Sequence, residues 1–246
     1  MRTIYFIFGF LLLVSCNNQV VEEAKQLNDE GVSRMDEEEY TQASLLFNRA
    51  LKTGDLPKEL SAGIFRNLSL LYTFQNEKDS ALYYAKIGFE GAEKDSYFYF
   101  LNKAEYLLLT NNVSDAISNY EKAKKLKSDE MAIYNSLGMI YSGSYGEEFK
   151  NYDKAMENNL KAYEITQREP LQEALAISYM NLERYKESIP FWKILIEKNP
   201  SKMEYHFQLG VAYFFSGKEG EGEKKMEYAA DRDENCRRML DEMMVE

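Results

Sequence analysis

Hydrophobic and polar positions divide the chain into three parts. An unbroken apolar run extends from Ile4 to Val14, behind a single cation at Arg2. A polar stretch, residues 17–23, follows it, and beyond that stretch small, apolar and aromatic residues recur among charged ones. Near the end, residues 237–245 carry apolar side chains at close to helical spacing, which predicts a final amphipathic helix.

Small residues show a period in the long middle part. A small residue is followed twelve positions later by another at Gly31/Ala43, Ser69/Ala81, Ala104/Ala116, Ala176/Ser188 and Gly210/Gly222, and seventeen positions later at Gly138/Ala155. The first members of these pairs are 38, 35, 34, 38 and 34 residues apart. Two helices approach closely where one of them presents Gly, Ala or Ser, so the period predicts six helical hairpins.

The residues around these pairs resemble the tetratricopeptide repeat (TPR), a 34-residue helix-turn-helix unit. Its pattern of Leu, a small residue and Tyr in the first helix is matched by Leu137, Gly138 and Tyr141, and by Leu209, Gly210 and Tyr213. The resemblance implies an all-α, right-handed superhelical solenoid of about six hairpins with a capping helix at 237–246. The expected hairpins are residues 24–57, 62–95, 97–130, 131–168, 169–202 and 203–236.

Composition agrees with an all-helical chain. Four prolines and 13 glycines are few for 246 residues, and 14% aromatics is high, which favours long helices packed through large side chains. The net charge of −11 would repel a phosphate backbone, so we expect no nucleic-acid partner.

The N-terminus reads as a secretory signal, residues 1–15, whose apolar run is too short to span a bilayer. Leu13-Val14-Ser15-Cys16 resembles the bacterial lipobox, which implies cleavage before Cys16 and acylation of its sulfur. Two or three acyl chains give stable attachment. By resemblance to enterobacterial sorting, in which Asp at this position retains a lipoprotein in the inner membrane, Asn17 implies the outer membrane, facing the periplasm. Residues 16–23 would then be a short lipidated tether. The alternative is an ordinary signal peptide with a chance cysteine.

Cys236 and His206 are both expected to have packing roles and not chemical ones. With Cys16 acylated, Cys236 has no thiol partner and is expected to be packed or partly exposed. His206, the only histidine, stands where the family places a large packing residue, so we expect a filled core position and no metal.

The resemblance also implies a concave groove lined by the first helix of each hairpin. The predicted partner-binding residues are Arg66, Leu70, Phe74, Phe98, Leu101, Glu105, Asn135, Met139, Asn181, Phe207 and Phe214, and counting from the same landmarks adds Asn28, Met35, Leu108, Ile177, Met180, Val211 and Phe215. Most are apolar, which suits an amphipathic helix or an extended apolar segment. The alternative is that tight curvature buries these side chains against one another. The Lys/Arg/Asn clamp with which some family members bind carboxylate termini is absent.

The five extra residues of the fourth unit fall within residues 142–149, between its two helices, and either contact a partner or are tolerated as a surface loop.

The favoured function is a membrane-tethered scaffold or adaptor that binds other envelope proteins or peptides. No nucleophile, carboxylate pair or metal set is apparent, so we expect neither an enzyme nor a cofactor. The alternative is a cell-surface or periplasmic receptor for peptides or glycans, with tyrosines as stacking surfaces.

Overall fold

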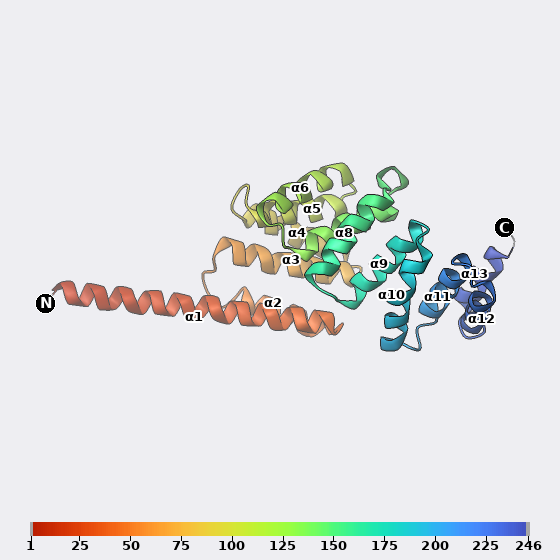
Figure 1. Cartoon of the computed structure of the whole chain (residues 1–246). Coiled ribbons are helices and arrows are strands. Elements are labelled where there is room, and N and C mark those ends of the chain that lie inside the picture. The colour runs from red at the N-terminus through yellow and green to blue at the C-terminus, as the bar shows by residue number, and fades with distance from the viewer. Residues whose placement is uncertain (1, 245–246) are drawn as a thin grey trace. The chain divides into compact units, whose positions relative to one another are not determined.

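The computed structural model describes the backbone of residues 2–244 and the side chains of residues 18–244 (Figure 1). Every regular element in this described part is helical. The chain divides into two compact units, Met1–Ser128 (unit 1) and Asp129–Glu246 (unit 2).

Unit 1 contains three hairpins made of antiparallel helix pairs. They are α1 (Arg2–Asp36) with α2 (Tyr40–Ala50), α3 (Lys58–Phe74) with α4 (Lys78–Gly91), and α5 (Tyr97–Leu109) with α6 (Val113–Leu126). The second hairpin starts at Lys58, before the predicted start at 62, because Pro57 stands directly ahead of the helix as its N-cap.

Unit 2 contains three further hairpins and one last helix. They are α7 (Met131–Met139) with α8 (Tyr152–Ile165), α9 (Glu169–Asn181) with α10 (Tyr185–Lys198), α11 (Met203–Phe215) with α12 (Glu219–Ala230), and α13 (Glu234–Met243). Among the described residues the predicted all-α class is therefore confirmed.

The extra residues of the fourth hairpin lie between α7 and α8. A π-helical turn, Ile140–Ser144, and a 3₁₀ turn, Glu147–Phe149, connect the two helices. Gly143 and Gly146 have φ angles of 98° and 128°, a region that L side chains rarely adopt, so the chain can leave the helical path here. Asn151 then caps α8 by accepting a hydrogen bond from the Lys154 backbone N–H at 3.0 Å.

Small residues bring the two helices of a hairpin into backbone contact. A Cβ atom built on Gly222 of α12 would lie 2.6 Å from the Phe214 nitrogen and 2.7 Å from the Gly210 carbonyl oxygen, both on α11. In the second hairpin the Ser69 hydroxyl of α3 donates to the Ala81 carbonyl of α4 at 2.9 Å. The predicted spacing of small residues therefore marks real points of closest approach.

Large side chains fill the volume around these contacts. In unit 1 the buried core includes Phe47, Ile64, Leu68 and Leu71. In unit 2 Trp192 packs against Tyr205, with ring centroids 5.9 Å apart. His206 is also buried, and its Nε2 lies 3.0 Å from the Pro200 carbonyl oxygen, which agrees with the predicted packing role.

The predicted signal peptide and tether both lie within α1. The backbone is helical without a break from Arg2 to Asp36, and the first buried side chain of the described residues is Ala24. The side chain of Cys16 lies outside the described residues, so lipidation stays a prediction. Among the helices that the structure describes, none has the length and apolar composition needed to cross a bilayer.

The last helix covers the end of unit 2 with an amphipathic face. Cys236 and Leu240 of α13 are buried in a core cluster with Phe207 and Met226, whereas Arg237 on the other face is exposed. Cys236 is a free thiol. Burial, with a smaller contribution from the nearby Asp233 carboxylate, raises the pKa of this thiol to about 11.

Gly222 and Gly220 of α12 allow a matched test of the close contact between α11 and α12. Gly222→Ala should lower the free energy of unfolding by about 2–3 kcal/mol, because its new methyl group would meet the backbone of α11. Gly220→Ala, which meets nothing within 4 Å, should raise it by about 0.5 kcal/mol through lower chain entropy in the unfolded state. Urea titrations followed by circular dichroism measure both values. Equal effects at the two positions would contradict the proposed contact.

Cys236 should react slowly with thiol reagents while the protein is folded. At pH 8 a thiol of pKa near 11 is ionised about 100-fold less than an ordinary cysteine, and burial reduces access further. A Cys16→Ser variant has Cys236 as its only thiol, so its rate with an aromatic disulfide reagent can be followed directly. The rate should rise towards that of a free thiol in 8 M urea, and fast reaction without urea would show that α13 does not cover this cysteine.

Candidate partner-binding surface

The side chains predicted to bind a partner lie on the first helices of the hairpins, but they differ in exposure. Phe74 and Met139 are exposed, at 55% and 45% of their full surface. Partly buried are Arg66, Leu70, Phe98, Glu105, Asn135, Asn181 and Phe214. The two units use these positions in different ways.

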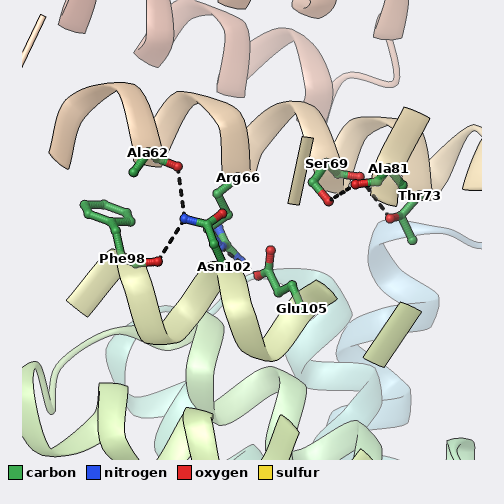
Figure 2. A network of polar contacts seen from close by, with 8 residues as sticks. All are labelled: Ala62, Arg66, Ser69, Thr73, Ala81, Phe98, Asn102 and Glu105. Atoms are coloured by element: carbon green, nitrogen blue, oxygen red, sulfur yellow. Dashed lines mark hydrogen bonds and ion pairs between the residues drawn. The ribbon is translucent and has the colours of Figure 1, made fainter. Parts of the chain in front are cut away.

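Arg66 and Glu105 form an ion pair between α3 and α5 in unit 1 (Figure 2). The Arg66 Nε donates to Glu105 Oε1 at 2.8 Å, and the two side chains are only 16% and 13% exposed. Burial, the largest single effect, would lower the pKa of Arg66, but the Glu105 carboxylate together with Tyr97 and Tyr120 raises it overall. The guanidinium therefore stays charged and is held by a partner within the chain.

Side-chain amides connect α3 to α1 and to α5. The Asn67 amide of α3 donates to the Asn28 side-chain oxygen of α1 at 2.9 Å. The Asn102 amide of α5 donates to the carbonyls of Ala62 and Phe98 at 3.2 and 2.9 Å, and Figure 2 shows it between α3 and α5. The amide nitrogens of Asn67 and Asn102 are thus bonded within unit 1, which favours a stabilising role over ligand recognition.

The remaining predicted residues of unit 1 mostly pack onto neighbouring helices. The Phe98 ring covers Gly63 of α3, where an added Cβ atom would lie 3.1 Å from the ring edge. Leu70 packs against the core of the unit. Phe74 lies beside Tyr40, with ring centroids 6.3 Å apart, and keeps one face exposed.

Three predicted partner-binding residues, Met35, Leu101 and Phe207, are buried, and the prediction of an exposed role is wrong for them. Leu101 lies on the buried side of α5 together with Asn102 and Ala104. Phe207 packs with Met226 in the cluster that α13 completes. A repeat position fixes the direction of a side chain, but the neighbouring helix decides whether water reaches it.

Exposed apolar side chains recur at one equivalent place in unit 2. The residue directly after the small residue of the first helix is Met139 in α7, Ile177 in α9 and Val211 in α11. Met139 and Ile177 are 45% and 40% exposed, and Val211 is partly buried. We call these three side chains the apolar row. In unit 1 the same place holds Val32 and Leu70, which are partly buried against the core, and Glu105, whose charge is paired.

Aromatic rings lie at the end of α11, one helical turn beyond Val211. Phe215 is 52% exposed and stacks on Tyr185 of α10, with ring centroids 5.0 Å apart and planes 23° from parallel. Phe214 packs edge-on against Phe215 and contacts the core. Tyr185 was not predicted from the sequence, because it lies on a second helix, outside the positions that the repeat pattern assigns to binding.

Asn135 and Asn181 are polar neighbours of this surface. Asn135 stands one helical turn before Met139, with its amide nitrogen 4.0 Å from the Met139 sulfur. Asn181 is the last residue of α9, four positions after Ile177, and is half-buried. Both amides offer hydrogen bonds beside an apolar contact area, which suits a peptide backbone.

No group of three or more His, Cys, Asp or Glu side chains that could hold a metal ion occurs among the described residues.

Comparison with solved structures identifies the fold. MamA (AMB-1) aligns with 72% of this chain and 93% of its own length, with a TM-score of 0.55 and 18% identity. YrrB, described as a TPR protein with an unusual peptide-binding site, aligns with 76% of this chain and 92% of its own, with a TM-score of 0.55 and 16% identity. The Thermus thermophilus TPR protein TTC0263 aligns with 78% and 99%, with a TM-score of 0.56 and 17% identity.

The fold is that of the TPR proteins. No family model and no curated protein matches the sequence. Identities of 16–18% establish the helical-repeat architecture alone, and the surface chemistry of this chain depends on its own residues.

Arg66 and Glu105 should stabilise unit 1 only when both charges are present. Arg66→Met should lower the free energy of unfolding by about 3 kcal/mol, because it leaves a carboxylate with little solvent access and no partner. Adding Glu105→Leu should restore most of the loss. The coupling energy comes from a double-mutant cycle measured by urea unfolding, with the exposed Arg184–Glu187 pair as a control expected to give under about 0.5 kcal/mol. Coupling no larger than that of the control would refute a structural role.

Proposed function

We propose that this chain is a membrane-anchored adaptor that binds an apolar segment of another envelope protein through the apolar row of unit 2 and Phe215. The observation that carries the proposal is the recurrence of exposed large apolar side chains at one place in consecutive first helices. Scattered apolar residues on a surface need no explanation, but repeated ones in register indicate a contact area.

The partner segment should combine apolar anchors with positive charge. Each well-buried anchor contributes about 2 kcal/mol to binding, so three or four suffice for a specific complex. Residues 129–246 carry 23 acidic and 15 basic side chains, a net charge of −8. This excess favours a partner with lysines or arginines flanking its apolar positions, because complementary charge speeds association and orients the complex.

The shared fold supports a peptide or protein ligand. YrrB, whose architecture this chain shares, has a peptide-binding site. Stacked helical repeats present long surfaces made from equivalent positions, which suits an extended or helical segment better than a small compact molecule.

The anchor belongs to the same proposal. Acylation at Cys16 would hold the repeats at the periplasmic side of the outer membrane, where envelope proteins assemble. The support is the Leu13-Val14-Ser15-Cys16 motif behind a short apolar run.

A receptor for glycans is the second candidate. Tyr83 of α4 is 59% exposed, and its neighbour Tyr84 stacks on Tyr72, with ring centroids 5.4 Å apart. An exposed tyrosine over a stacked pair could carry a sugar ring. Tyr83→Ala should abolish binding in that case and leave an adaptor unaffected.

The chain offers a matched pair of surface variants to test the adaptor. Met139→Ser/Ile177→Ser/Phe215→Ser removes apolar side chains from first helices of unit 2. Leu160→Ser/Ile194→Ser/Tyr228→Ser removes equally apolar side chains, 37–40% exposed, from second helices of the same unit. The first variant should weaken partner binding at least tenfold, about 1.4 kcal/mol or more, and the second should leave it unchanged.

The measurement has two stages. Cross-linking of the lipidated protein in its own membranes, compared quantitatively between the two variants, selects the partner whose recovery depends on the first helices. Calorimetric titration of the repeats with a peptide from that partner then gives the affinities. Equal loss in both variants, or loss in neither, would contradict binding at the apolar row.

A further inference from the structure

Helix α1 leaves little chain between the proposed acylation site and the folded repeats. Its backbone is continuous through Cys16 and onward to Asp36. Val20 and Val21 are already half-buried, and Ala24 is fully buried in the core of unit 1. Only residues 17–19 therefore separate the acylated position from the first side chain that packs.

Val20 contacts the loop that connects the first two hairpins. A Cβ atom built on Gly54 would lie 3.0 Å from the Val20 Cγ1 atom. Gly54 belongs to residues 51–57, between α2 and α3. This connecting loop therefore lies beside the fourth residue after Cys16.

The rise of α1 from Cys16 to Val20 gives the expected depth of Val20 in the bilayer. Four residues of α-helix rise about 6 Å. A bilayer of about 40–45 Å with a hydrocarbon core of about 30 Å has a headgroup layer of about 6 Å on each side. Acyl chains on Cys16 would enter the hydrocarbon, which brings Val20 and the connecting loop to the level of the headgroups.

The exposed chemistry of the connecting loop suits that level. Leu51 and Leu56 pack into the core of unit 1, while Lys52, Asp55 and the adjacent Lys58 are exposed. The two ammonium groups match phosphate headgroups, Asp55 carries the opposite charge, and the apolar side chains of the loop face the protein core.

Helix α3 runs alongside α1 in the direction away from Cys16, because Gly54 lies beside Val20 whereas Asn67 bonds to Asn28. Helix α3 runs for 17 residues from Lys58, directly after the loop, to Phe74. Its length is about 26 Å, so Gln75 lies far beyond the headgroup layer if the loop lies within it.

We propose that the first hairpin rests directly on the lipid surface, with residues 51–57 in the headgroup layer, because α1 joins the anchor to the repeats without a flexible linker. This inference depends on the proposed acylation of Cys16 and specifies how it orients unit 1.

Fluorescence quenching in vesicles tests the orientation. Asp55→Cys and Gln75→Cys, each in the full chain with Cys236→Ala, are labelled with an environment-sensitive fluorophore after purification in the lipidated form. Both positions are exposed and lie near opposite ends of α3. Vesicles of phosphatidylcholine with a nitroxide on the headgroup should quench the label at position 55 at least about twofold more than the label at 75.

A linker variant is the matched control. About twelve Gly and Ser residues inserted between Asn18 and Gln19 span about 20 Å as a flexible coil and leave Val20 and its contacts in place. This insertion should remove the difference in quenching between positions 55 and 75 while the protein stays on the vesicles.

The outcomes separate the anchor from the orientation. If mass spectrometry of the N-terminal peptide finds no lipid on Cys16, and Cys16→Ala is no more soluble than the natural chain, the anchor fails and the orientation fails with it. If Cys16 is acylated but positions 55 and 75 are quenched equally, or 75 more strongly, the orientation is overturned and the anchor stands.

Discussion

Close packing of the two helices in a hairpin depends on small residues, which face a side chain of the second helix at Gly31 and Gly138 and its backbone at Gly210. At Gly210 and Gly222 even one methyl group would collide with the facing backbone, and at Ser69 the side chain bonds the opposite carbonyl. This contact sets the distance between the two helices, and the large side chains on either side, such as Phe47 and Trp192, then fill the space that this distance leaves. The same contact also fixes where the apolar row lies, because each of its three residues directly follows the small residue of a first helix in unit 2.

The two units apply the same repeat geometry to different chemistry. In unit 1 the facing first helices carry polar groups that satisfy one another, including the Arg66–Glu105 pair and the Asn28–Asn67 bond. In unit 2 the equivalent helices carry exposed Met139 and Ile177. A paired charge with little solvent access gives a ligand little to bind, whereas exposed apolar area gains free energy when a partner covers it. Unit 1 also exposes Phe74, but only unit 2 repeats exposed apolar side chains directly after the small residue, which is why we propose partner binding there.

Contacts with neighbouring helices explain why several residues that the repeat pattern assigned to partner binding are buried or paired in the structure. The pattern assigned Leu101 and Phe207 to a binding surface, yet both are buried, Phe207 in the cluster completed by α13. It assigned Arg66 to the same surface without showing that Glu105, 39 residues later, neutralises it. Tyr185 stacks on Phe215 from a second helix, which no count along the first helices would reveal.

The sequence by itself determined the all-helical class and marked positions such as Gly210 and Gly222 where two helices approach closely, because these depend on local spacing and on the absence of a side chain at a few positions. It also carries the Cys16 motif, whose chemistry needs no fold. Only the tertiary structure decided which surface positions are exposed, which charges are paired and how directly α1 joins the repeats. Those properties depend on atoms contributed by residues far away in the chain, and a repeat pattern contains the direction of a side chain but not what lies opposite it.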